Sequence, residues 1–87
     1  MPYDVPLPHG IRALWKAKIL DREVPREEPH VTIICKTRRW RYAIRMPAFL
    51  DDDPSPRDVP DAVLAAIAAD HESIVAAWNV RHPHNPV

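Results

Sequence analysis

The chain has 87 residues with twelve Lys or Arg and twelve Asp or Glu, a length that supports one domain, 1–87, around a single hydrophobic core. Its single glycine excludes the glycine-rich phosphate loops of nucleotide-binding proteins, and its single cysteine, Cys35, excludes an internal disulfide framework and a cysteine-rich zinc site. No apolar stretch approaches the ~20 residues of a membrane-spanning helix, so we expect no membrane contact. Together with the single glycine and the single cysteine, this predicts a cytoplasmic protein with no cofactor and no bound metal.

The N-terminal residues predict an extended segment and then a strand. Residues 1–10 carry three prolines and the glycine, which favours an extended lead-in. The segment 11–19 alternates apolar with mostly cationic side chains, which is the period of a half-buried strand. Its Ala, Leu and Lys residues also suit a helix, but the alternation favours the strand. We therefore expect the first strand at 11–19, followed by a polar loop at 21–29.

Residues 30–46 are rich in β-branched and aromatic side chains around a short polar tip, a pattern typical of a β-hairpin. The tip lacks Asn-Gly and Asp-Gly, so a four-residue connection at 36–39 is favoured over a primed two-residue turn. The resulting register pairs apolar residues throughout, as Cys35–Trp40, Ile33–Tyr42 and Val31–Ile44. Because a slip of one residue would turn every apolar side chain to the other face, this parity is strongly specified.

The predicted sheet has two contrasting faces. Its apolar face carries ten side chains: Ile11, Trp15, Ile19, Val31, Ile33, Cys35, Trp40, Tyr42, Ile44 and Met46. Its other face, the predicted basic face, carries His30 and seven cations: Arg12, Lys16, Lys18, Lys36, Arg39, Arg41 and Arg45. Cations spaced along and across strands are able to contact successive phosphates or carboxylates, so these seven residues are the predicted anion-binding site.

The C-terminal half predicts one long helix. Asp58 is the expected N-cap, with Pro60 in the first turn. At 100° per residue, one half of the helix is mainly apolar and contains Val59, Val63, Leu64, Ile67, His71, Ile74, Val75 and Trp78. The opposite half is alanine-rich and is either plain helix-forming sequence or a surface for a homodimer. We therefore predict an α+β fold, a three-stranded mainly antiparallel sheet with one long C-terminal helix on its apolar face, and a flexible tail at 80–87.

Titratable groups outside the basic face suggest structural roles. His71 lies in the apolar half of the helix, where a lone histidine is more often a hydrogen-bonded core residue than a ligand or base. His82 and His84 lack a third ligand at fixed spacing, and the acidic run 51–53 lacks the glycine turn of a calcium loop. Cys35 is expected to pack as a small apolar side chain beside Trp40.

Two segments of the chain partly resemble the sequence motifs of a known protein family. "EEPHVTI" and "VPDAVLAAIAADHESIVAAW" are similar to a small bacterial domain of unknown function with a Pro-Pro-His-Phe-His-Val segment and a Leu-Pro before a helix. The resemblance covers residues 28–79. It rests on six matching positions: Pro29, His30, Val31, Pro60, His71 and Trp78. It implies a component of a toxin–antitoxin-like module. A mobile-element component is the other role that we expect for the chain.

Three functions follow as hypotheses from these patterns. The first is a non-enzymatic module whose basic face binds nucleic acid or an acidic protein. The second is a metal-independent ribonuclease in which His30 acts as acid or base and Arg41 or Arg45 stabilises phosphate charge. The third is a homo-oligomeric structural protein joined through the alanine side of the helix. Residues 1–46 hold ten Lys or Arg against five acidic residues, and 47–87 hold two against seven. This division favours the first hypothesis, a charged surface for a partner, and leaves open that the two halves attract and neutralise each other.

Overall fold

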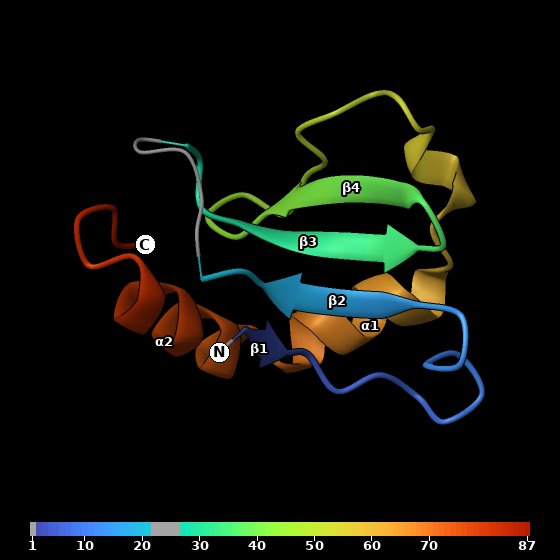
Figure 1. Ribbon diagram of the computed structural model, residues 1–87, viewed down its shortest axis with the longest axis horizontal. Coiled ribbons are helices and arrows are strands. Elements are labelled where there is room, and N and C mark those ends of the chain that lie inside the picture. Colours follow the sequence, from blue (N-terminus) through green and yellow to red (C-terminus); the bar gives the residue numbers. More distant parts are fainter. Residues whose placement is uncertain (1, 22–26) are drawn as a thin grey trace.

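The chain forms an antiparallel meander in which each strand pairs with its neighbour in sequence (Figure 1). A computed structural model describes residues 2–21 and 27–87. The sheet has the order β1–β2–β3–β4, with strands Tyr3–Asp4, Lys16–Ile19, His30–Cys35 and Arg38–Ala43. A short 3-10 helix and two α-helices follow: η1 (Pro56–Asp58), α1 (Asp61–Ala69) and α2 (His71–Arg81).

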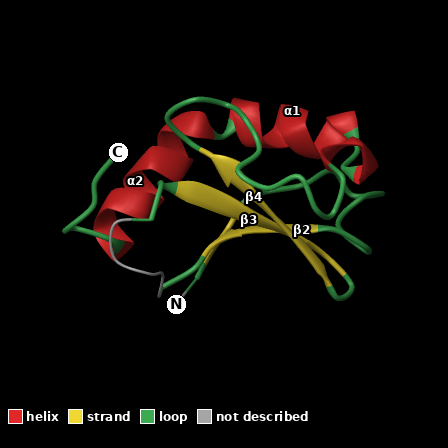
Figure 2. Cartoon of the chain, turned by 90° about the horizontal axis from the view of Figure 1, so that it is seen from above, coloured by secondary structure: helices red, strands yellow, loops and turns green. Residues whose placement is uncertain are grey.

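Both α-helices lie on one side of the sheet, which leaves its other side uncovered by helix (Figure 2). The expected α+β class with an antiparallel sheet is thus confirmed. The expected counts were wrong, because the sheet has four strands instead of three and two helices replace one long helix. In the part of the chain that the structure describes, neither helix has the length and apolar character needed to cross a bilayer.

The additional strand, β1, lies in the predicted lead-in. Tyr3 pairs with Ile19 and Asp4 with Lys18, and the Val5 amide donates to the Ala17 carbonyl at 2.8 Å. The strand stays short because Pro6 and Pro8 have no N–H to continue the ladder. Proline spacing therefore sets where this edge strand ends.

The expected first strand at 11–19 is wrong over its first half. Residues 11–14 form a turn, and the amides of Leu14 and Trp15 both donate to the Ile11 carbonyl at 3.0 Å. β2 begins only at Lys16. The chain must reverse here so that β1 can pair with β2, and the helix-favouring Ala and Leu residues form that reversal. Of the predicted loop at 21–29, residues 22–26 lie outside the described part of the chain.

The hairpin of β3 and β4 has a different register from the predicted one. Its pairs on the helix-covered face are Cys35–Arg38, Ile33–Trp40 and Val31–Tyr42. The strands are connected by the two-residue turn Lys36–Thr37 and not by the predicted four residues. Lys36 adopts a left-handed backbone conformation in this turn, with φ of 56°. The register differs by two residues, an even number, so each side chain keeps its predicted face.

The helical region breaks at Asp70. The Asp70 amide donates to the carbonyls of Ala66 and Ile67 at 3.1 and 3.2 Å, and its carboxylate accepts a 2.6 Å hydrogen bond from the Tyr3 hydroxyl. A new helix starts immediately after it. The predicted burial of His71 is wrong, because His71 is the exposed first residue of α2.

The predicted helix start at Asp58 is also wrong. Asp58 lies in η1, whose N-cap is Ser55, and α1 begins three positions later at Asp61 after the N-cap Pro60. The Ser55 side chain accepts from the Arg57 amide at 3.3 Å. The proline-rich sequence therefore forms a separate turn before the α-helix, since each proline removes a backbone donor.

The core lies between the sheet and the helices. Trp40 and Trp78 are fully buried, and their indole N–H groups donate to the carbonyls of Ser55 at 3.1 Å and Asn85 at 2.6 Å. Trp15 is only partly buried, with its ring centroid 5.4 Å from that of Trp40. Each buried indole thus has a hydrogen-bond partner, as burial of a polar group requires.

The C-terminal residues return to the sheet instead of leaving the domain. Residues 80 and 81 of the predicted tail belong to α2. Beyond them, His82 Nε2 lies 2.8 Å from the Leu20 carbonyl, and the Asn85 side chain donates to the Glu27 carbonyl. The end of the chain therefore contacts both sides of the connection between β2 and β3.

Candidate anion-binding face

The sheet surface opposite the helices, here the open face, carries cations of β2 and β4 on either side of β3. Two rows run across the strands. The first row is Lys16–Ile34–Arg39 and the second is Lys18–Thr32–Arg41. Adjacent strands lie about 4.8 Å apart and the two rows about 7 Å apart. Four of the seven predicted anion-binding residues are thus brought together by the sheet.

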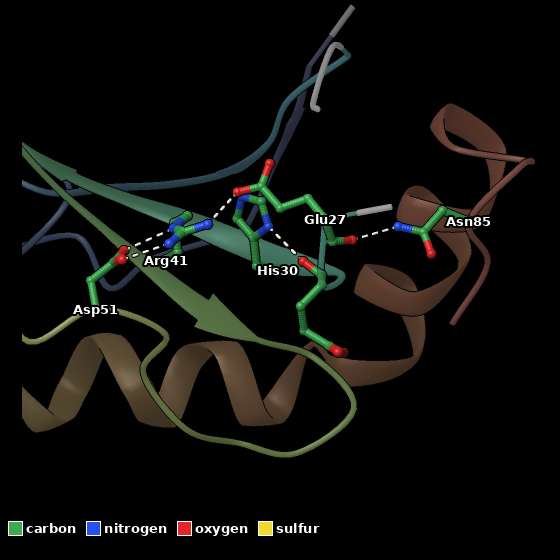
Figure 3. Close-up of polar contacts among 6 residues, drawn as sticks. Glu27, His30, Arg41, Asp51 and Asn85 are labelled. Atoms are coloured by element: carbon green, nitrogen blue, oxygen red, sulfur yellow. Dashed lines mark hydrogen bonds and ion pairs between the residues drawn. The ribbon is translucent and has the colours of Figure 1, made fainter. Parts of the chain in front are cut away.

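Arg41 in the second row is neutralised by two acidic side chains. It donates to both carboxylate oxygens of Asp51, through Nε at 2.8 Å and Nη2 at 2.6 Å, and its Nη1 contacts Glu27 (Figure 3). These hydrogen bonds raise the pKa of Arg41 and hold the pKa of Asp51 below its ordinary value. Arg41 is therefore fixed in the charged state and is already paired.

The rest of the second row is also paired, whereas the first row is not. Lys18 Nζ lies 3.3 Å from the Asp4 carboxylate on β1. Among the described residues, Lys16 and Arg39 make no ion pair. The positive charge that remains available on the open face is consequently concentrated at the hairpin end of the sheet.

The other three predicted anion-binding residues lie off the sheet surface. Arg12 is in the 11–14 turn, where its Nη2 donates to His9 Nδ1 at 2.8 Å. Lys36 is exposed in the hairpin turn next to the first row. Arg45 lies beyond β4 and donates to the Pro86 carbonyl at 2.7 Å, with Glu28 at 3.6 Å. Alternation along a strand predicted all three on the face, but none of them belongs to a strand.

A hollow of about 290 Å³ opens on the β4 side of the open face. It is lined by Leu20, His30, Thr32, Arg39, Arg41 and Asp51. Of the proposed ribonuclease residues, His30 and Arg41 reach this hollow, and Arg45 does not line it. A second hollow, of about 380 Å³, lies where the lead-in separates from β2, and Arg12, Lys16 and Lys18 are among its lining residues.

His30 forms a buried wall of the first hollow. It is 2% exposed, its Nδ1 lies 2.8 Å from the Glu28 carbonyl, and its ring centroid lies 5.6 Å from that of Trp78. Because a carbonyl oxygen only accepts hydrogen bonds, Nδ1 carries the proton in this contact. Figure 3 shows that His30 connects the start of β3 to the preceding segment. Its contact with Trp78 also connects β3 to α2.

The sequence left neutralisation between the two halves open, but it did not single out the carboxylates that organise this face. Asp4, Glu27 and Asp51 each contact a cation of the second row. Glu27 and Asp51 lie in acidic runs, "EE" and "DDD", that flank the hairpin, and this symmetry was the available signal. Thr32 was also missed, because the prediction of the basic face considered charged side chains and Thr32 is uncharged.

Within residues 2–21 and 27–87, no group of three or more His, Cys, Asp and Glu side chains is arranged to hold a metal ion. Comparisons with family models, with curated proteins and with solved structures gave no match.

Proposed function

We propose that this protein is a small binding module that holds a nucleic acid by its phosphates on the open face. The observation that carries the proposal is the difference between the two rows. Lys18 and Arg41 are paired with acidic side chains, whereas Lys16 and Arg39 have no ion-pair partner among the described residues. Unpaired cations on a surface are the groups that release counterions when phosphates bind.

The spacing of the first row suits a phosphate backbone. Lys16 and Arg39 lie on strands separated by β3, hence about 10 Å apart at the backbone. Their long side chains bring the charged ends within reach of neighbouring phosphates. Ile34 between them provides an apolar floor without a charge.

The surface favours backbone contacts over base reading. Trp40 is buried in the core on the helix side, and Trp15 and Tyr42 pack against that core. Stacking of single-stranded bases requires exposed aromatic rings on the binding surface, and the two rows of the open face contain none. We therefore expect similar affinity for unrelated sequences.

The test compares two matched charge reversals. Arg39→Glu changes an exposed arginine of the open face, and Arg57→Glu makes the same change in η1, outside the sheet. Binding to fluorescent oligonucleotides of unrelated sequence is measured between 50 and 200 mM salt. We expect Arg39→Glu to weaken binding about tenfold or more at low salt and to make the slope of log K against log salt shallower by about one unit.

Arg57→Glu should leave affinity within about twofold, since it removes no phosphate contact. Equal effects of the two reversals, or an absence of binding by the wild-type chain, would contradict the proposal. An acidic peptide that binds more tightly than any oligonucleotide and depends on Arg39 would assign the face to an acidic protein partner instead.

The ribonuclease and homo-oligomer hypotheses have less support in the geometry. His30 is buried, Arg41 is held by two carboxylates, and Arg45 contacts the C-terminal residues, so no described arrangement presents all three to one substrate. Exposed alanines on the helices include Ala65, Ala68, Ala69 and Ala76. A toxin–antitoxin role stays a prediction from the resemblance.

A further inference from the structure

Thr32 occupies the centre of the open face. Its direct cross-strand neighbours are Lys18 and Arg41, and its diagonal neighbours are Lys16 and Arg39. Diagonal neighbours in a sheet lie about 7–8 Å apart, a distance that long side chains span. Thr32 itself is only 5% exposed, so four cationic side chains surround one small polar residue.

The Thr32 hydroxyl has no assigned partner. It makes no hydrogen bond to any described residue, although the rest of the side chain is buried. Among the same residues, no fully buried polar side-chain atom lacks a hydrogen-bond partner. The hydroxyl oxygen must therefore reach the surface of the hollow that Thr32 lines.

The other side chains that line the hollow differ in whether they already have hydrogen-bond or ion-pair partners. Arg41 is fixed by Asp51 and Glu27, and the His30 ring is fixed by the Glu28 carbonyl. Arg39 is exposed and has no ion-pair partner among described residues. The hollow thus combines Arg41 and Asp51, which hold each other, the Thr32 hydroxyl, and one exposed guanidinium, Arg39, without an ion-pair partner among the described residues.

We propose that this hollow is a phosphate subsite in which Thr32 donates its hydroxyl hydrogen to a phosphate oxygen while the Arg39 guanidinium pairs with the same group. Hydrogen bonds to a charged oxygen are shorter and stronger than neutral ones, and an arginine fork matches two phosphate oxygens at once. Arg41, held by Asp51 and Glu27, contributes a fixed wall whose charge is already compensated, so Thr32 and Arg39 are the groups that bind the phosphate. The inference deepens the proposed function and rests on it, because it names where one phosphate of the nucleic acid sits.

A phosphate group reaches the hollow from one of two sources. An internal phosphodiester carries one negative charge and must continue in both directions across the sheet. A terminal phosphate or a free nucleotide carries close to two charges at neutral pH, since its second pKa is about 6. The experiment therefore uses an oligonucleotide with a 5′-phosphate, the same oligonucleotide with a 5′-hydroxyl, and inorganic phosphate.

The central variant is Thr32→Val, which removes the hydroxyl and keeps the shape and β-branching of the side chain. Its matched control is Thr37→Val, in the exposed hairpin turn. We expect Thr32→Val to weaken oligonucleotide binding about tenfold, as loss of a hydrogen bond to a charged group does. Thr32→Ser, which keeps a hydroxyl, should bind the oligonucleotide with nearly wild-type affinity, and Thr37→Val should bind as the wild type does. Thermal unfolding confirms that each variant is folded.

Comparing the oligonucleotides with and without a 5′-phosphate shows which kind of phosphate occupies the hollow. A Thr32→Val defect confined to the 5′-phosphorylated strand assigns the subsite to a terminal phosphate, and an equal defect in both assigns it to the internal backbone. Unchanged binding by Thr32→Val, together with weaker binding by Arg39→Glu, would overturn the subsite and leave the proposed function standing.

If the wild-type chain binds no oligonucleotide, the proposed function fails and inorganic phosphate decides the subsite alone. A saturable shift of the Thr32 amide and methyl NMR signals on adding phosphate, lost in Arg39→Glu, would support it. Signals that do not move with phosphate would refute it.

Discussion

Arg41 and Asp51 join strand β4 to the connection that follows it by two hydrogen bonds, Nε to Oδ2 at 2.8 Å and Nη2 to Oδ1 at 2.6 Å. The third guanidinium nitrogen contacts Glu27, which precedes β3. One side chain thus connects the open face to the segments on both sides of the hairpin (Figure 3). This arrangement determines which cations of the face stay available to a ligand.

Removing the Asp51 charge should lower stability by a small amount that depends on pH. Both side chains are about one-third exposed, 38% for Arg41 and 31% for Asp51, so solvent screening limits the loss to about 1 kcal/mol. The pKa of Asp51 lies below its ordinary value of 3.8 in the fold, mainly because Arg41 donates to it. The stabilisation is therefore complete above the unfolded pKa and is lost as pH falls through the folded pKa.

Urea unfolding of the wild type and of Asp51→Asn, followed by tryptophan fluorescence between pH 2 and pH 7, measures this effect. The difference in the free energy of unfolding should be constant at neutral pH and shrink below about pH 4. Asp52→Asn, at an exposed neighbouring position, is the control and should change little. A difference that does not depend on pH would contradict the role of the ion pair.

Tyr3→Phe should destabilise the junction between β1 and the helix break. The Tyr3 hydroxyl donates to the Asp70 carboxylate at 2.6 Å, and loss of this bond should cost about 1–2 kcal/mol. Burial, and then the hydrogen bond to Asp70, raise the pKa of Tyr3 above its ordinary value of 10.0. Because the folded pKa is raised, this contribution is complete below pH 10 and is lost as pH rises through the folded value.

Absorbance at 295 nm and urea unfolding between pH 8 and pH 12 test this prediction together. The wild type should show one tyrosine that ionises late, and Tyr3→Phe should lack it. The stability difference between the two should decrease above about pH 10. Late ionisation that persists in Tyr3→Phe would assign the shift to another residue.

Lys36→Gly should stabilise the hairpin. Lys36 has φ of 56°, a conformation in which glycine has no steric cost and other residues do. We expect a gain of up to about 1 kcal/mol in the free energy of unfolding. Thr37→Gly is the matched control, because the positive φ is at Lys36 and not at Thr37, so its added chain entropy should destabilise. Equal effects of the two glycines would show that the turn has another conformation.

The three tryptophans should differ in their contribution to stability. Trp40 and Trp78 are 0% and 1% exposed, so replacing either with alanine should cost about 3–5 kcal/mol. Trp15 is partly buried, with its ring centroid 5.4 Å from that of Trp40, so Trp15→Ala should cost about half as much. Chemical denaturation of each variant measures the order. A loss for Trp15→Ala as large as for Trp40→Ala would indicate that Trp15 is buried more deeply.

Local sequence determined the class of the fold and the two faces of the sheet. Alternation placed Val31, Ile33, Cys35, Trp40 and Tyr42 on one face of the hairpin and His30, Arg39 and Arg41 on the other, and this assignment survived a register that differs by two residues. It survived because the side-chain period of a strand is two, so an even shift changes partners without changing faces. The same periodicity identified most of the buried helix residues, including Val63, Ile67, Ile74 and Trp78.

Tertiary structure decided what the local pattern left open. The first half of 11–19 alternates like a strand, but it forms a turn because β1 has to fold back onto β2. The helix breaks where Tyr3, 67 positions away in sequence, donates to Asp70. The availability of each cation also depends on distant carboxylates, since Arg41 is paired by Glu27 and Asp51 while Arg39 is not. Contacts between residues far apart in sequence have no signature in local periodicity, so only the folded chain shows which charges remain for a ligand.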